Sequence, residues 1–204
     1  MTIIVLASNN EKKAREMRSL LPEGFEVLTA SQANISMPDE TGTTFEDNAL
    51  LKARVAARQS GHLSVADDSG LEVDALDGRP GVRSARFATD YGRPENDDEN
   101  NRLVLELLEN VPTGERSARF VSAVAVVGPD DDEVVVRGEV EGEIGFEPRG
   151  QNGFGYDPLF TPNDSHRTMA ELTDDEKNAI SHRGRAFKGA VPHILEAANR
   201  NRKG

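Results

Sequence analysis

Cysteine is absent from the 204-residue sequence, which excludes a disulfide framework, a thiolate metal site and a cysteine nucleophile. Long apolar runs are also absent. The longest, at residues 120–128, is far too short to span a membrane and is typical of a buried strand. No basic segment precedes the apolar residues of the N-terminus, so a signal peptide is not expected. These absences predict a cytoplasmic protein that has no membrane partner.

Positive charge is scarce as well. The formal net charge of −12 argues against a nucleic-acid partner, because phosphate backbones require a basic surface. A small anionic substrate is still compatible with this charge if cationic side chains gather locally or a metal ion binds. Lysine occurs only at positions 12, 13, 52, 177, 188 and 203, which favours its use as a point charge at a few sites. A compositional preference for arginine explains the same pattern without any function.

The chain length suits one sizeable domain or two small lobes that share a sheet, and we expect a single α/β domain over residues 1–204. Apolar and β-branched runs predict strands at residues 3–7, 25–30, 63–67, 118–128 and 133–145. Helical spacing predicts a helix that stops at Pro22, helices at residues 43–61 and 97–111, and a last helix that opens at Thr173 and bends or restarts at Pro192. Strands and helices alternate early and a hairpin follows, so we expect a mixed sheet.

The segment SNNEKK, at residues 8–13, directly follows the first predicted strand and opens a helix. Free backbone N–H groups and the positive end of the helix dipole favour an anion there, and Lys13 adds a charge. The segment lacks the glycines of a P-loop. An ordinary helix cap with a solvated lysine is the alternative, and this segment alone favours it.

The next candidate segment, at residues 38–54, places acids ahead of Lys52. Glu46 and Asp47 need no function, because acids in the first turn stabilise a helix. Glu40 lies in the loop before the helix and is outside that explanation. Lys52 equally fits a surface lysine.

The segment ADDSG places Asp67 and Asp68 side by side at the predicted end of a strand. Mg²⁺ binds through one or two carboxylates while substrate phosphates complete its ligands, and a carboxylate can also deprotonate a water. The alternative is an Asp-Ser-Gly turn, a common way to reverse the chain.

Two later segments, NGFGYDP at residues 152–158 and EKNAISHRGRA at residues 176–186, combine glycines, aromatic rings and hydrogen-bond donors. Gly153 and Gly155 permit close backbone approach, and Phe154 or Tyr156 offers a face on which a base can stack. Five residues separate the two donors Lys177 and His182, so a straight helix does not place them on one stripe. A solvated basic face is the alternative.

Together these segments resemble the inosine triphosphate pyrophosphatase family, enzymes that remove noncanonical purine nucleotides from the nucleotide pool. The matching stretches are SNNEKKARE, ETGTTFEDNALLKA, ADDSGLEVDALDGRPGVRSAR, GFGYDPLF and AELTDDEKNAISHRGRA. They run from residue 7 to residue 187, so the resemblance covers nearly the whole chain, and their joint order makes it highly specific.

The resemblance implies an α/β fold with two lobes around a long central mixed sheet flanked by helices, assembled as a homodimer. It implies Mg²⁺-dependent hydrolysis of ITP, dITP and XTP to the nucleoside monophosphate and pyrophosphate. A non-catalytic nucleotide-binding module and a pyrophosphatase for modified pyrimidine nucleotides are the alternatives. The intact set of Asp68, Glu40 and Lys13 argues against the first of these.

The resemblance also implies residue roles. Asp68 matches the proton acceptor and, with Glu40, the metal-binding acids. The other matching positions correspond to substrate contacts: Ser8, Asn9, Asn10, Glu11, Lys12, Lys13, Lys52, Ser69, Phe154, Gly155, Tyr156, Asp157, Lys177, His182 and Arg183. Asp47 departs from the family, where many members carry Glu, and Asp67 is expected to support the site without touching substrate.

Base selection follows from hydrogen bonding. Hypoxanthine and xanthine present an acceptor at C6 that Lys177, His182 or Arg183 can meet. Adenine presents an amino donor there and leaves those donors unpaired, which is costly in a buried site.

Overall fold

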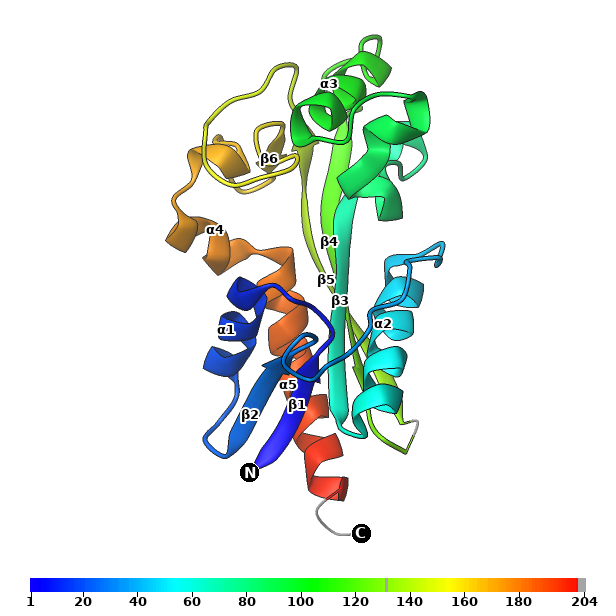
Figure 1. Ribbon diagram of the computed structural model, residues 1–204. Helices are drawn as coiled ribbons and strands as arrows, with labels where there is room; N and C mark the ends of the chain where they lie inside the picture. Colours follow the sequence, from blue (N-terminus) through cyan, green and yellow to red (C-terminus); the bar gives the residue numbers. More distant parts are fainter. Residues whose placement is uncertain (131, 202–204) are drawn as a thin grey trace. The chain divides into compact units, whose positions relative to one another are not determined.

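The computed structural model describes residues 1–130 and 132–201. Within that part the chain forms a six-stranded sheet in the order β2-β1-β3-β4-β5-β6 (Figure 1). The strands are β1 (Thr2–Leu6), β2 (Phe25–Thr29), β3 (Leu63–Val73), β4 (Ser117–Val127), β5 (Glu133–Ile144) and β6 (Phe160–Pro162). Strand β1 runs parallel to β2 and β3, whereas β5 and β6 are antiparallel. The predicted α/β fold with a mixed sheet is therefore confirmed.

The α-helices are α1 (Glu11–Leu20), α2 (Phe45–Ser60), α3 (Asp97–Leu107), α4 (Asp174–Ile180) and α5 (His182–Asn201). Three 3₁₀ segments, η1 (Asp74–Leu76), η2 (Gly81–Tyr91) and η3 (Met169–Glu171), were not predicted from the sequence. Helix α2 is capped by Thr44, whose hydroxyl accepts the Asp47 N–H. It ends at Gly61, whose φ of +68° suits a glycine cap.

Contacts divide the chain into two compact units. Unit 1 comprises residues 1–68, 122–138 and those from 185 onward, and unit 2 comprises residues 69–121 and 139–184. Strands β3, β4 and β5 each contribute residues to both units. Each unit has its own hydrophobic core.

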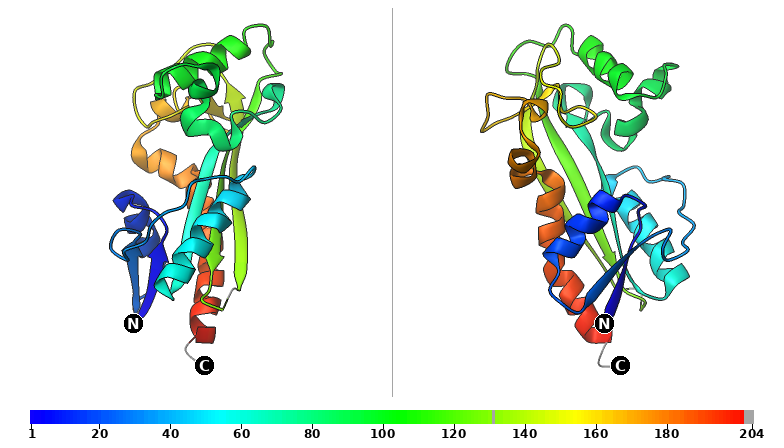
Figure 2. Two further views of the ribbon diagram at one scale, coloured as in Figure 1. Left: turned by 45° about the vertical axis from the view of Figure 1, so that its right-hand side comes forward. Right: turned by 60° about the vertical axis from the view of Figure 1, so that its left-hand side comes forward.

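In unit 1, one face of the strands packs against α1 and α5. Ile4 and Leu6 of β1 share a core with Met17 of α1 and with Phe187 and Ile194 of α5. Burial of each such side chain contributes about 1.5–3 kcal/mol relative to exposure. Helix α2 contacts β1 and lies on the opposite side of the strands from α1 and α5 (Figures 1 and 2). The strands of unit 1 are therefore covered by helices on both faces.

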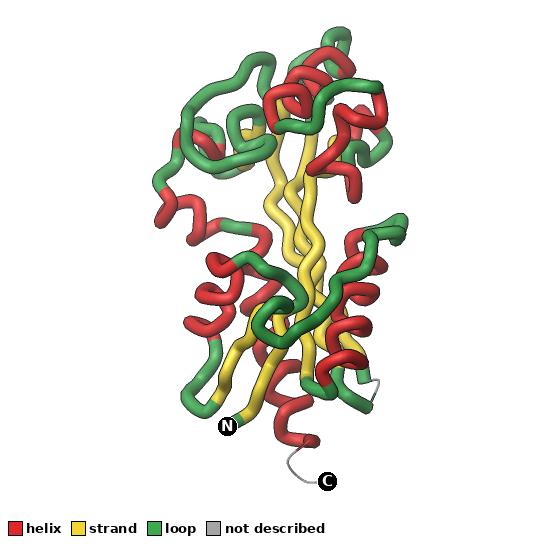
Figure 3. Tube along the Cα trace, viewed as in Figure 1, coloured by secondary structure: helices red, strands yellow, loops and turns green. Residues whose placement is uncertain are grey.

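In unit 2, α3 and η2 cover a core that includes Leu71 of β3, Phe87 of η2, Leu103 of α3 and Phe160 of β6. The buried Arg116 donates to the carbonyls of Leu108, Val111, Ile144 and Gly145 and so ties the end of α3 to the end of β5. Much of residues 145–173 is loop (Figure 3).

Two expectations about element boundaries are wrong. Strand β3 does not end at Asp67 but continues to Val73, because the apolar alternation resumes at Leu71 and Val73, both fully buried in unit 2. The predicted last helix is interrupted at Ser181, where the backbone is extended, and not at Pro192, which lies inside α5. The Ser181 hydroxyl accepts the Gly184 N–H and so caps the start of α5.

No helix within residues 1–130 and 132–201 combines the length and the apolar character needed to cross a membrane.

Candidate active site

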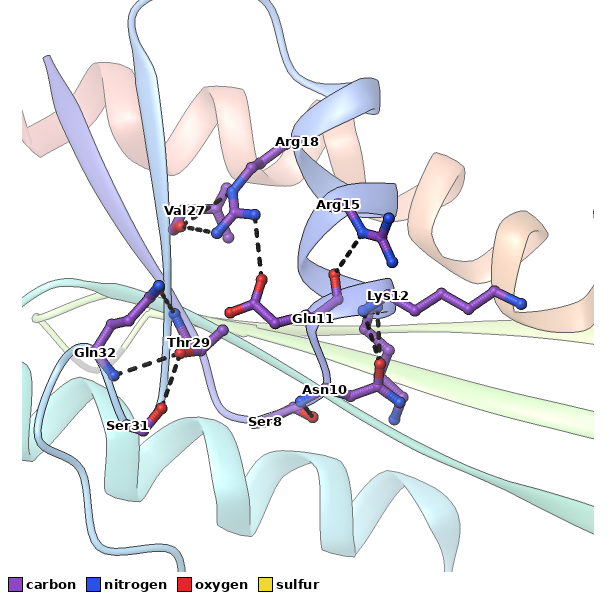
Figure 4. Close-up of polar contacts among 11 residues, drawn as sticks. Ser8, Asn10, Glu11, Lys12, Arg15, Arg18, Val27, Thr29, Ser31 and Gln32 are labelled. Atoms are coloured by element: carbon purple, nitrogen blue, oxygen red, sulfur yellow. Dashed lines mark hydrogen bonds and ion pairs between the residues drawn. The ribbon is translucent and has the colours of Figure 1, made fainter.

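The junction between β1 and α1 is held by its own side chains (Figure 4). Asn10 caps α1, since its Oδ1 accepts the N–H groups of Lys12 at 2.9 Å and Lys13 at 3.2 Å. The Ser8 hydroxyl accepts the Asn10 N–H, and Asn9 Oδ1 accepts the N–H of Ser31 at the end of β2. Two helix N–H groups are thus already capped, which is the ordinary-cap alternative raised by the sequence.

The charged side chains of this junction point in different directions. Lys12 extends away from β1 and β2 in Figure 4, whereas Glu11 pairs with Arg18 at 3.6 Å. Lys13 reaches instead to β3, where its Nζ lies 2.8 Å from both carboxylate oxygens of Asp67. The Asp67 side chain is only 1% exposed, so this lysine balances a buried carboxylate.

Asp67 and Asp68 do not share one partner, although they are adjacent. Successive side chains of a strand point to opposite faces, and β3 continues through both residues. Asp67 meets Lys13 of α1, and Asp68 meets Lys52 and Asn48 of α2. The continuous strand thus separates two carboxylates that would otherwise repel each other.

Lys52 lies between two acids. Its Nζ donates to Glu40 Oε1 at 2.6 Å and to Asp68 Oδ1 at 3.2 Å. Burial acts to lower the pKa of Lys52, but the Asp68 and Glu40 carboxylates outweigh it, so the pKa lies above its ordinary value. Burial raises the pKa of Asp68 and Glu40 adds to that effect, while Lys52 and Asn48 oppose it. Glu40 itself lies in the loop of residues 30–44 visible in Figure 3.

The charges of this cluster suit a bound cation. Glu40 and Asp68 supply two carboxylates against the one ammonium group of Lys52, which leaves one formal negative charge, while Lys13 and Asp67 balance each other. The donor set is made of hard carboxylate oxygens, the ligands that Mg²⁺ takes one or two at a time. No group of three or more His, Asp or Glu residues in the described part of the chain could hold a metal alone. Glu40 and Asp68 are therefore suitable ligands for an ion whose other ligands come from water or substrate.

Asn48 is a site residue that the sequence reasoning missed. It is 1% exposed, its Nδ2 donates to Asp68 Oδ2 at 3.1 Å, and its Oδ1 accepts the Gly42 N–H at 2.7 Å. A Cβ at Gly42 would lie 2.7 Å from Asn48 Oδ1, so the glycine permits this contact. The signal was the spacing of Asn48 and Lys52, which puts both on one face of α2.

Unit 2 holds the second group of candidates, in the loop after β5. Asp157 is buried; it accepts the Phe154 N–H at 2.8 Å and forms an ion pair with Lys177. Tyr156 is also buried, and its hydroxyl donates to the Ser84 carbonyl at 2.8 Å, so it serves to anchor the loop. Burial raises the pKa of Tyr156, with a smaller contribution from Asp97.

Phe154, unlike Tyr156 and Asp157, is an exposed residue, with 62% of its surface accessible, and Lys177 Nζ lies 4.7 Å from the centroid of its ring. His182, at the start of α5, stacks on Phe120 with the ring centroids 5.1 Å apart. Arg183 follows it in α5, and the break at Ser181 removes the straight-helix geometry that had separated these donors from Lys177.

The candidates thus fall into two groups. Unit 1 brings Glu40, Lys52 and Asp68 together beside α2, and it brings Lys13 to Asp67 beside the capped α1 junction of residues 8–12. Unit 2 brings together Phe154, Gly155, Tyr156, Asp157 and Lys177, and it also contains Ser69, His182 and Arg183.

Comparison with known proteins gives concordant matches. The family model described as the Ham1 family matches residues 4–193. A "dITP/XTP pyrophosphatase" of Frankia alni is 53% identical over 196 residues, covering 95% of this chain and 97% of that protein. One of the same name from Elusimicrobium minutum is 50% identical over 191 residues, covering 91% and 95%. The solved structure of a HAM1 protein from Coxiella burnetii has a TM-score of 0.88 at 44% identity and covers 96% of this chain and 100% of that one.

Proposed function

We propose that this chain, which belongs to the Ham1 family, hydrolyses noncanonical purine nucleoside triphosphates such as dITP, ITP and XTP to the monophosphate and pyrophosphate. The observation that carries the proposal is the near-complete match to relatives named dITP/XTP pyrophosphatase. The family suggested by the sequence motifs is thereby confirmed. The activity is a hydrolysis that helps to clear such nucleotides from the pool.

We assign the phosphate chemistry to unit 1. Lys13 and Lys52 supply the positive charge that an acidic chain needs near a triphosphate. Residues 8–12 directly precede Lys13, at the junction between β1 and α1. Glu40 and Asp68 would hold Mg²⁺, which supplies charge stabilisation for the pyrophosphate leaving group when bound. The excess negative charge of the cluster supports this choice of metal-binding residues.

The reaction then proceeds by attack of water on the α-phosphorus. The Asp68 carboxylate orients the water and accepts its proton as the new P–O bond forms. The bond from the α-phosphorus to the bridging oxygen breaks, and pyrophosphate leaves with the electron pair. Asn48 holds Asp68 Oδ2 throughout, which leaves the orientation of this carboxylate defined.

We assign base recognition to unit 2. The exposed Phe154 ring offers a stacking face, and Lys177, His182 and Arg183 are donors for the C6 oxygen of hypoxanthine or xanthine. Ser69, Gly155, Tyr156 and Asp157 shape the surroundings, the last two from buried positions. Adenine lacks the matching acceptor and is disfavoured.

The proposal extends to the organisation of the protein. Residues 1–204 act as one domain, because three strands of the sheet contribute to both compact units. We expect a homodimer in the cytoplasm. We also expect no nucleic-acid partner, because the net charge of −12 is unfavourable for binding phosphate backbones.

The decisive experiment is a product assay with dITP and Mg²⁺. We expect pyrophosphate and dIMP, with little orthophosphate. The panel includes ITP, XTP, dATP, dGTP and modified pyrimidine triphosphates, and Asp68→Asn protein serves as a control for contaminating activity. Absence of turnover with ITP, dITP and XTP would overturn the proposal. Tight dITP binding without turnover would instead indicate a nucleotide-binding module, and a preference for pyrimidines would identify a different pyrophosphatase.

A further inference from the structure

The first two turns of α3 hold both backbone polar groups of Gly155, in the loop that carries Phe154. Asp97 Oδ2 accepts the Gly155 N–H at 2.7 Å, and Asn101 Nδ2 donates to the Gly155 carbonyl at 2.9 Å. Asp97 and Asn101 are four residues apart and therefore lie on one face of the helix. Gly155 has a φ of +60°, so its backbone is fixed in the left-handed region between these two side chains.

The hydrogen bonds on both sides of Gly155 complete the restraint. On the N-terminal side the Phe154 N–H donates to Asp157, and on the C-terminal side the Tyr156 hydroxyl donates to Ser84. Phe154, an exposed residue, is therefore attached to a backbone that is hydrogen bonded at Phe154 and Gly155 and is followed by the anchored Tyr156 side chain. The direction of the Phe154 ring depends on how firmly the backbone of Gly155 is held.

We infer that Asp97 and Asn101 are positioning residues for base recognition: they hold the Gly155 N–H and carbonyl so that Phe154 presents its ring to the purine. This inference rests on the function proposed above. Neither residue belongs to the sequence motifs of the family resemblance, and neither touches substrate in this scheme. They act through the loop of residues 153–157.

A role of Asn101 in core packing alone does not explain why an asparagine stands at this position. Asn101 is 8% exposed, and its buried Oδ1 has no hydrogen-bond partner among the described residues. An unsatisfied buried acceptor is costly, whereas an apolar side chain at this position would avoid that cost. The contribution that an asparagine makes here is its donation to Gly155. The adjacent Asn100 contrasts with it, because its amide contacts Ala88 and Ala85 instead.

The first test measures the loop itself and needs no activity. The chain contains no tryptophan, so Phe154→Trp introduces a single tryptophan at the ring position, which can be excited apart from the two tyrosines. Time-resolved anisotropy of this reporter is compared with and without Asn101→Ala or Asp97→Ala, with Asn100→Ala as the matched buried control. We expect faster local motion with the first two changes and none with the third. Equal mobility in all of these proteins would overturn the inference.

The second test separates base from phosphate recognition in protein with Phe154 intact. Asn101→Ala and Asp97→Ala should raise KM for dITP about tenfold. The inhibition constant of inorganic tripolyphosphate, which has no base, should stay within about twofold. Asp97→Asn keeps an oxygen acceptor and should restore KM, and Asp98→Ala, an acid in the same first turn, should change neither constant.

The outcomes distinguish this inference from the proposed function. Asp97 is exposed, so its variant folds even if Asn101→Ala does not. Parallel losses in KM and in tripolyphosphate inhibition would contradict a role in base positioning. If the unmodified chain does not hydrolyse dITP, the proposed function fails, and the anisotropy comparison still decides whether α3 holds the loop.

Discussion

Replacement of Gly153 by alanine tests how the loop that carries Phe154 is built. Gly153 has a φ of +80°, and a Cβ there would overlap Asp157 Oδ2 and lie 2.9 Å from Asp157 Cγ and 3.0 Å from Lys177 Nζ. Asp157 is 4% exposed and has a short side chain, so it cannot move aside while it keeps both of its contacts. Gly153→Ala should therefore displace Asp157 from the Phe154 N–H and from Lys177.

The expected loss of stability has two parts. The left-handed conformation costs a non-glycine residue roughly 1–2 kcal/mol. Loss of a hydrogen bond to a charged group adds about 1.5–3 kcal/mol. Gly153→Ala should accordingly lower the free energy of unfolding by about 3 kcal/mol. Gly78 is a matched control, because its φ is +79° and a Cβ there would meet no atom within 4 Å. Gly78→Ala should cost only the conformational part, about 1 kcal/mol.

Urea unfolding, followed by circular dichroism, measures the loss of unfolding free energy in both variants, provided that the dependence of this free energy on urea concentration is the same in each. A difference between the two variants of less than about 0.5 kcal/mol would refute the steric reasoning. An Asp157→Ala background provides a second check, since Gly153→Ala should then cost no more than Gly78→Ala.

Three further predictions concern catalysis and acid stability. Asp68→Asn should lower turnover of dITP by about 10²–10⁴-fold while equilibrium binding of dITP persists, as measured by calorimetry; unchanged turnover would remove Asp68 from its role. Removal of divalent metal with EDTA should abolish pyrophosphate release, and Mg²⁺ should restore it; activity that persists in EDTA would contradict the assigned metal site. The Arg167 guanidinium, with the Thr173 N–H, lowers the pKa of Glu176 from 4.5 to about 2. Because this pKa is lower in the folded state, the ionised Glu176 stabilises the protein above pH 4.5, and that stabilisation is lost as the pH falls towards 2. The melting temperature of Glu176→Gln should therefore change less between pH 4.5 and 2 than that of the unmodified protein. Equal pH profiles for both proteins would contradict this.

The elements that were predicted well are those set by local sequence. Helix α1 begins after Asn10 and stops ahead of Pro22, and α2 begins after Thr44 and ends at Gly61, because caps and helix breakers act within a few residues. The strand β3 and the last helix were predicted less well. Leu71 continues β3 because it enters the core of unit 2, and Ser181 divides α4 from α5 through a cap that the helical pattern did not reveal.

The candidate site divides in the same way. The order of the motifs was sufficient to suggest the family, and the resemblance to that family was what nominated Glu40, Lys52 and Asp68. The long-range contacts of the site could not be predicted from the sequence, because Lys13 meets Asp67 across 54 positions and Asn101 meets Gly155 across the same separation. Such contacts depend on how strands and helices pack and not on spacing along the chain.

The sequence by itself thus determined which chemical groups are present, where its capped helices start, and the family to which the chain belongs. Only the tertiary structure decided how the adjacent acids Asp67 and Asp68 are used. Because β3 runs through both, their side chains leave opposite faces, one towards Lys13 of α1 and the other towards Lys52 of α2. Two carboxylates that repel in a short peptide are each paired with a lysine, since a sheet covered by helices on both faces supplies a different partner on each side.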